Sequence, residues 1–140
     1  MKIVDEKLAP YGVLVLRVGL GVMYISHALM KWFVFTIPGL ASWLDTQGIP
    51  SALAWPLFIL ELGGGLAILF GIYGRYVALL LMPILLVAAG IHFPNGWVHT
   101  SAGGGWEYPI FLAVTSVAYA LIGDGAFAVR SRHKLIPDKT

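Results

Sequence analysis

The chain has 140 residues, of which 59% are hydrophobic and only 11% are charged, and its mean hydropathy is +0.83. A water-soluble domain of this length needs far more polar surface than this composition provides, so we predict an integral membrane protein. Cysteine is absent, which excludes disulfides, thiolate metal ligands and a dithiol redox relay within the chain. The formal net charge is +2, and the placement of Lys and Arg indicates membrane topology, not nucleic-acid binding.

Four apolar stretches, bounded by polar residues or by glycine and proline, are each about long enough to cross a bilayer. In chain order they cover residues 10–35, 51–73, 75–93 and 106–123. The first is too long for a secretory signal sequence and lacks a cleavage motif, so we expect it to be retained as a membrane anchor. The predicted fold class is therefore all-α: a single membrane domain, residues 1–140, folded as a four-helix up-and-down bundle.

Basic residues predict the orientation of this bundle. They lie before the first stretch, between the second and third, and after the fourth, whereas the connections 36–50 and 94–105 contain no Lys or Arg. The positive-inside rule then places both termini, including a tail over residues 124–140, in the cytoplasm. The basic residues concerned are Lys2, Lys7, Arg75, Arg130, Arg132, Lys134 and Lys139. The residues expected to form an outer aromatic belt are Trp32, Trp43, Trp55, Trp97 and Trp106.

Four polar residues share one face of the first predicted helix. Arg17, Tyr24, His27 and Lys31 are spaced 7, 3 and 4 residues apart, which places them in line along a helix. We expect this face to point into the bundle, because polar groups are costly against lipid. Arg17 also has a simpler alternative role, in which it snorkels to the inner surface or bridges to Asp124, and Lys31 has one as an interfacial anchor.

Glu61 is the strongest functional candidate. It lies roughly 15 Å from the outer end of the second stretch at about 1.5 Å per residue, which is close to the bilayer midplane. A carboxyl group at this depth must be protonated or paired. We expect Gly64 and Gly65 to leave room beside it. The opposite side of the helix would form a packing ridge, within the bundle or between copies in a homo-oligomer, from Gly63, Ala67 and Gly71.

Two further ionisable residues lie near the outer ends of predicted helices. His92 ends the third stretch and Glu107 begins the fourth. With His27, Lys31 and Glu61 they would line one pocket open to the outer leaflet. The simpler alternatives are a histidine that bonds to a loop carbonyl and a carboxylate that favours the helix N-terminus. Two histidines without a closely spaced third ligand do not predict a metal or haem site.

Three blocks of the sequence, taken together, resemble a known protein family. They are Arg17-x-Gly19 with His27-x-x-x-Lys31, then Glu61-Leu62-Gly63-Gly64-Gly65 leading to Gly71 and Arg75, and finally His92-x-Pro94-x-Gly96 with Gly104-Gly105-Trp106-Glu107-Tyr108. Together they resemble the DoxX family over about residues 11–124, although Ala28 stands where the family more often has glycine. The resemblance implies a four-helix protein of the bacterial inner (plasma) membrane. Its relatives include subunits of thiosulfate:quinone oxidoreductase and of complexes that handle thiol and oxidative stress.

The function expected from these residues is that of a redox-associated membrane subunit that binds a quinone or a similar hydrophobic carrier. The catalytic candidates are two hydrogen-bond donors to the quinone carbonyls and a proton reservoir: His27, His92 and Glu61. The candidates for cofactor binding would stabilise negative charge, stack on the ring or border the pocket: Arg17, Lys31, Tyr24, Trp106 and Glu107. We expect no intrinsic cofactor, and electrons would come from a partner redox protein or a soluble reductant.

Two alternatives remain open from the sequence. In a noncatalytic structural or assembly subunit, Glu61 would pair with Tyr24, His27 or Lys31 only to hold the helices in register. In a proton or small-solute conductor, Glu61 and the histidines would form a relay. The second alternative is weaker because the inner half offers few polar positions for a path.

Overall fold

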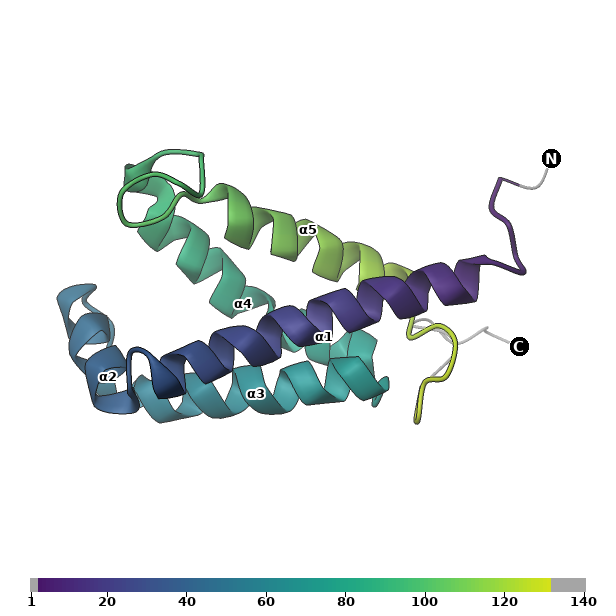
Figure 1. Ribbon diagram of the computed structural model, residues 1–140, viewed down its shortest axis with the longest axis horizontal. Coiled ribbons are helices and arrows are strands. Elements are labelled where there is room, and N and C mark those ends of the chain that lie inside the picture. Colours follow the sequence, from purple (N-terminus) through teal and green to yellow (C-terminus); the bar gives the residue numbers. More distant parts are fainter. Residues whose placement is uncertain (1–2, 132–140) are drawn as a thin grey trace, which may run out of the picture.

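The computed structural model describes residues 3–131, and its regular elements there are all helical (Figure 1). In chain order the α-helices are α1 (Ala9–Phe33), α2 (Ile37–Thr46), α3 (Ala54–Phe70), α4 (Gly74–His92) and α5 (Glu107–Ile122). A 3-10 turn, η1 (Ser51–Leu53), precedes α3, and a second, η2 (Phe93–Asn95), follows α4. The predicted all-α fold class is confirmed for the described residues.

Three helical segments of the described chain are long and apolar enough to cross a membrane: Ala9–Phe33, Ser51–Phe70 and Gly74–Asn95. They coincide closely with the first three predicted spans. The fourth predicted span corresponds to α5, which is apolar but has only 16 residues. At 1.5 Å per residue α5 is about 24 Å long, somewhat shorter than a hydrocarbon core of about 30 Å.

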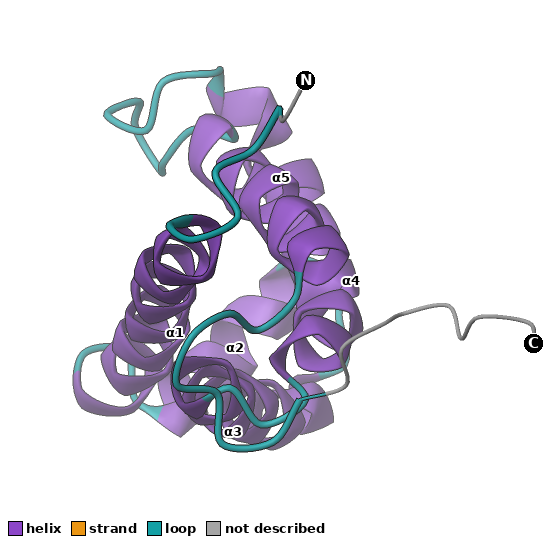
Figure 2. Cartoon of the chain, turned by 90° about the vertical axis from the view of Figure 1, so that its right-hand side faces the viewer, coloured by secondary structure: helices purple, strands orange, loops and turns teal. Residues whose placement is uncertain are grey.

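The four longer helices surround a common core. α1 packs against α3, α3 against α4, α4 against α5, and α5 against α1, as the end-on view in Figure 2 shows. Buried side chains from all four helices meet at the centre, among them Leu20, Ile68, Leu81 and Tyr119. Large apolar side chains such as Val15, Ile59 and Leu80 are exposed on the outer surface, as expected for helices that face lipid.

The glycines of α3 pack differently from the sequence prediction. A Cβ atom on Gly65 would lie 2.9 Å from the Cβ of Tyr24, and one on Gly64 would lie 2.7 Å from Cδ1 of Leu81. Gly64 and Gly65 therefore allow α3 to approach α1 and α4 closely, and the prediction that they leave room beside Glu61 was wrong. Gly63 is exposed, and a Cβ atom added there would have no neighbouring atom within 4 Å, so Gly63 makes no close contact within the described chain.

α2 was expected only as part of the connection over residues 36–50. Its N-terminus is capped by Thr36, whose side-chain oxygen accepts a hydrogen bond from the Gly39 amide at 3.2 Å. Ile37, Leu40 and Leu44 are buried and form a second apolar core with residues of α1 and α3. α2 therefore covers the end of the α1–α3 pair (Figure 1).

A buried polar cluster joins the helices at the opposite end. Arg17 Nη1 donates to the main-chain carbonyl of Asp124 at 2.5 Å. The Asp124 carboxylate accepts hydrogen bonds from the Arg75 amide at 3.1 Å, from the Tyr119 hydroxyl and from the Ser131 hydroxyl at 2.7 Å. Arg17 therefore contacts Asp124, as its simpler alternative role proposed, but through the backbone of Asp124.

Part of the predicted cytoplasmic tail belongs to the fold. The Ala126 amide donates to the Pro10 carbonyl at 3.0 Å, and the Arg130 amide donates to the Gly71 carbonyl at 3.1 Å. These bonds hold residues 124–131 against α1 and the end of α3. The remainder of the predicted tail, residues 132–140, lies outside the described residues, as does Lys2.

Candidate functional site

A cavity of about 750 Å³ lies at the end of the molecule that carries α2. Residues of all five α-helices line it, and most of them are apolar, such as Met23, Leu40, Leu57, Ile84 and Leu112. The volume lies within the range of small-molecule binding sites in proteins. The cavity is therefore large enough for the head group of a hydrophobic ligand.

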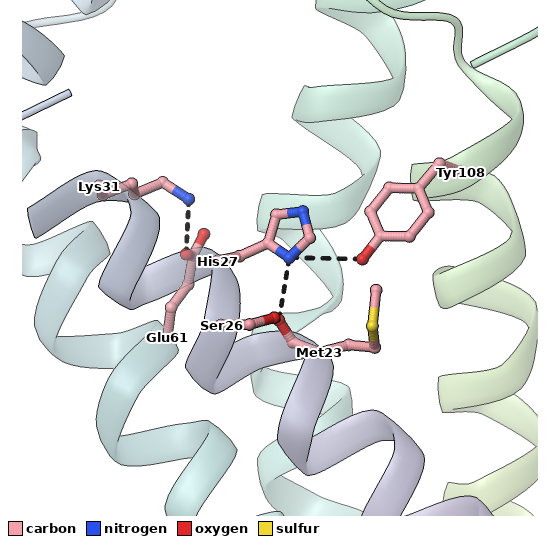
Figure 3. A network of polar contacts seen from close by, with 6 residues as sticks. All are labelled: Met23, Ser26, His27, Lys31, Glu61 and Tyr108. Carbon is pink, nitrogen blue, oxygen red and sulfur yellow. Dashed lines mark hydrogen bonds and ion pairs between the residues drawn. The ribbon is translucent and has the colours of Figure 1, made fainter. Parts of the chain in front are cut away.

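An ion pair between α1 and α3 borders this cavity. Lys31 Nζ lies 2.6 Å from Glu61 Oε2, and their side chains are 17% and 8% exposed (Figure 3). Charged groups in such a poorly hydrated place are stable only when they are paired. The pairing therefore explains how the carboxyl group of Glu61 is stable within an apolar helix. Lys31 is one of the three partners that the sequence analysis named for Glu61.

His27 lies one helical turn before Lys31 and stacks on Tyr108 of α5. The two ring centroids are 5.2 Å apart with an interplanar angle of 17°, and the Tyr108 hydroxyl lies 3.4 Å from His27 Nδ1. His27 Nδ1 also lies 2.9 Å from the main-chain carbonyl oxygen of Met23 (Figure 3). These contacts fix the orientation of the imidazole ring at the wall of the cavity.

Two other predicted site residues also line the cavity. Tyr24 is buried, and its hydroxyl lies 3.4 Å from the Ser116 hydroxyl of α5. His92 lies at the end of α4, and its Nδ1 atom is buried without a hydrogen-bond partner among the described residues. Within residues 3–131, no group of three or more His, Asp or Glu side chains is placed to hold a metal ion.

The structure thus brings five of the eight predicted site residues to one cavity: Tyr24, His27, Lys31, Glu61 and His92. Three others do not line it. Arg17 belongs to the polar cluster at the opposite end, and Trp106 packs against Trp97 with ring centroids 4.4 Å apart. Glu107 accepts hydrogen bonds from the main-chain amide and from Nδ1 of His99, each at 2.7 Å.

Some residues of the cavity were not identified from the sequence. From the sequence, Tyr108 was noted only as the last residue of the block that begins at Gly104. Its position in the sequence does not relate it to His27. The α2 residues Leu40, Trp43 and Leu44 also line the cavity. Their helical spacing is a signal that could have identified α2.

Comparison with known proteins identifies the family. The family model named DoxX matches residues 12–100, a segment that includes His27, Lys31, Glu61 and His92. The chain belongs to the DoxX family. Together with the three membrane-length helices, this makes the DoxX protein described here a multi-pass membrane protein.

Two relatives cover most of this DoxX protein. It is 27% identical over 129 residues to "Inner membrane protein YqjF" of Escherichia coli (strain K12), which covers 89% of this chain and 93% of the relative. It is 30% identical over 118 residues to "Putative oxidoreductase CatD" of Bacillus subtilis (strain 168), which covers 84% of each chain. No solved structure gives a significant match. The family and the first relative agree with the expected location in the bacterial inner membrane.

Proposed function

We propose that this DoxX protein is a redox-associated membrane subunit that binds a quinone or a similar hydrophobic carrier. The observation that carries the proposal is an apolar cavity of about 750 Å³ with a small set of polar groups at its wall: Lys31, Glu61, His27 and His92. Apolar walls suit the ring and tail of such a carrier, and a few polar groups suit its oxygens. The name of the relative CatD supports the redox class.

The residues around the cavity would have distinct roles toward this carrier. A bound quinone would supply the two-electron chemistry that the side chains do not. The Lys31 ammonium and the Tyr108 hydroxyl offer hydrogen-bond donors to a ligand oxygen. Glu61 holds Lys31 in place through the 2.6 Å ion pair, and the stacked rings of His27 and Tyr108 form an aromatic wall. Electrons would come from a partner redox protein or a soluble reductant.

We also propose that α1, α3, α4 and α5 form a four-helix up-and-down bundle in the membrane, with both termini in the cytoplasm. The placement of Lys and Arg supports this orientation. So does the arrangement of the chain, because both described ends lie opposite α2 and the loop before α5 (Figure 1). The shorter α5 can be accommodated by local thinning of the bilayer. In this orientation the cavity lies in the outer half.

A structural subunit is the second candidate function. The Lys31–Glu61 ion pair supports it, because an interhelical pair can hold α1 and α3 in register without any ligand. The two candidates differ in what the cavity contains, so a binding measurement separates them.

The test is a calorimetric titration in which a short-chain quinone is added to the purified protein in detergent. Ala88 lines the cavity, and Ala88→Trp would fill part of it with an indole ring. Leu86 on the same helix is 53% exposed and does not line the cavity, so Leu86→Trp is the matched control. We expect wild type and Leu86→Trp to bind alike and Ala88→Trp to bind at least about tenfold more weakly, a difference of about 1.4 kcal/mol. Absence of binding by a folded wild type would overturn the proposal.

A further inference from the structure

We infer that the cavity selects the reduced, hydroquinone form of its carrier, because His27 presents a hydrogen-bond acceptor to the ligand. This inference rests on the proposed function and adds the redox form of the ligand to it. It also changes the role of His27, which was expected from the sequence to donate to a quinone carbonyl.

The hydrogen bond of His27 within its own helix fixes the position of the ring proton. Nδ1 lies 2.9 Å from the carbonyl oxygen of Met23. A carbonyl oxygen can only accept, so Nδ1 must donate and must carry the proton. In the neutral ring Nε2 then has a lone pair and no proton. Nε2 makes no hydrogen bond within residues 3–131, as Figure 3 shows for its neighbours. The His27 side chain also lines the cavity.

Within residues 3–131, no neighbouring donor occupies Nε2 of His27. Lys31 lies four residues further along the same helix face, and its ammonium group is already paired with Glu61 at 2.6 Å. In the neutral ring the lone pair of Nε2 is therefore available to a ligand.

The two redox forms of the carrier differ in what they offer to this lone pair. A quinone oxygen is a carbonyl and only accepts, so it would face Nε2 with no proton between them. A hydroquinone oxygen is a hydroxyl and can donate to Nε2. Glu61 Oε1, which has no hydrogen-bond partner among the described residues, adds a second acceptor. A ligand that lacks the donor leaves Nε2 and Oε1 unpaired in a largely apolar cavity, so it should bind more weakly.

The test compares ligands of one shape under anaerobic conditions: a short-chain quinone, its hydroquinone and the dimethyl ether of that hydroquinone. Dissociation constants are measured by calorimetry for wild type, His27→Phe and His99→Phe, since His99 does not line the cavity. Phenylalanine retains a flat ring that can stack on Tyr108 but removes the acceptor. We expect wild type to bind the hydroquinone about tenfold more tightly than either the quinone or the ether, as for one lost hydrogen bond. These ratios should fall to near unity in His27→Phe and persist in His99→Phe.

The possible outcomes distinguish failure of this inference from failure of the proposed function. Equal affinity of wild type for quinone and hydroquinone, or a preference that His27→Phe retains, overturns the inference while the proposed function stands. Failure of folded wild type to bind any of the three ligands overturns both. The wild-type ratios need no variant, and the ¹⁵N chemical shifts of the His27 ring in labelled wild type give an independent measurement. A proton on Nε2 instead of Nδ1 would contradict the inference.

Discussion

Lys31 and Glu61 connect α1 to α3 through an ion pair of 2.6 Å at the wall of the cavity. Each residue lies on a helix that is otherwise almost free of charge, so each depends on the other for its stability in an apolar environment. The same two residues also supply polar groups to any ligand in the cavity. The pair therefore links the packing of the helices to the chemistry of the site.

Removal of one partner of this pair should destabilise the protein. Glu61→Gln leaves the ammonium of Lys31 without a carboxylate, and we expect the free energy of unfolding in detergent to fall by about 2 kcal/mol, since the pair is not fully buried. In the double variant Lys31→Met with Glu61→Met, most of the stability should return. If the pair also acts on the ligand, the double variant should bind quinone more weakly than wild type does. A double variant that binds quinone like wild type would favour the structural role.

Gly65 should tolerate no side chain, because α1 lies directly against it. A Cβ atom there would lie 2.9 Å from Ile25 Cγ1 and 3.0 Å from the Ile25 amide nitrogen. The backbone atom cannot move without separating the helices, so we expect Gly65→Ala to cost about 1–3 kcal/mol. Gly63→Ala is the matched control two residues earlier, where no atom lies within 4 Å, and it should be neutral or slightly stabilising. Equal unfolding midpoints for the two variants would refute the packing described for α3.

Asp124 should be required for the stability of the end opposite the cavity. Its carboxylate lies among the buried residues Arg17, Arg75 and Tyr119. Asp124→Asn replaces the carboxylate that accepts hydrogen bonds from Arg75, Tyr119 and Ser131, and we expect a loss of about 1–3 kcal/mol in the free energy of unfolding. Asp45 is exposed, so Asp45→Asn serves as the control and should have no effect. If both variants unfold like wild type, the cluster does not hold the helix ends together.

Glu107 should affect the loop before α5 without affecting ligand binding. Its carboxylate accepts two hydrogen bonds from His99, and it does not line the cavity. In Glu107→Ala we expect hydrogen exchange at the His99 amide to rise about tenfold. The quinone dissociation constant should stay within about twofold of wild type. Thr100→Ala in the same loop is the control for exchange, and a large loss of quinone affinity in Glu107→Ala would place this residue in the site.

Much of the fold could be predicted because lipid imposes a simple pattern. Uninterrupted apolar stretches and their short connections gave the positions of α1, α3, α4 and α5, since helix length is set by bilayer thickness. α2 was missed because its ten residues contain Pro38 and Gly39 and are too few to resemble a membrane span. The tight faces of α3 were misassigned because helical spacing alone does not show which neighbour each glycine meets.

The site could be predicted only in part. Arg17, His27 and Lys31 share a helix face, but the cavity is lined only by the part of that face nearer the C-terminus of α1, and Arg17 belongs to a different cluster. Spacing within one helix could not reveal this difference in depth. Tyr108 contacts His27 across 81 positions of sequence, and such a contact follows from tertiary packing alone.

The most direct test of the proposed function is the quinone content of protein purified from its own membrane. The protein would be isolated in mild detergent, extracted with solvent and analysed by mass spectrometry, with Ala88→Trp and Leu86→Trp prepared in parallel. We expect near-stoichiometric quinone in wild type and in Leu86→Trp, and its loss from Ala88→Trp. Folded wild type without quinone, or Ala88→Trp that retains it, would contradict a carrier site in this cavity.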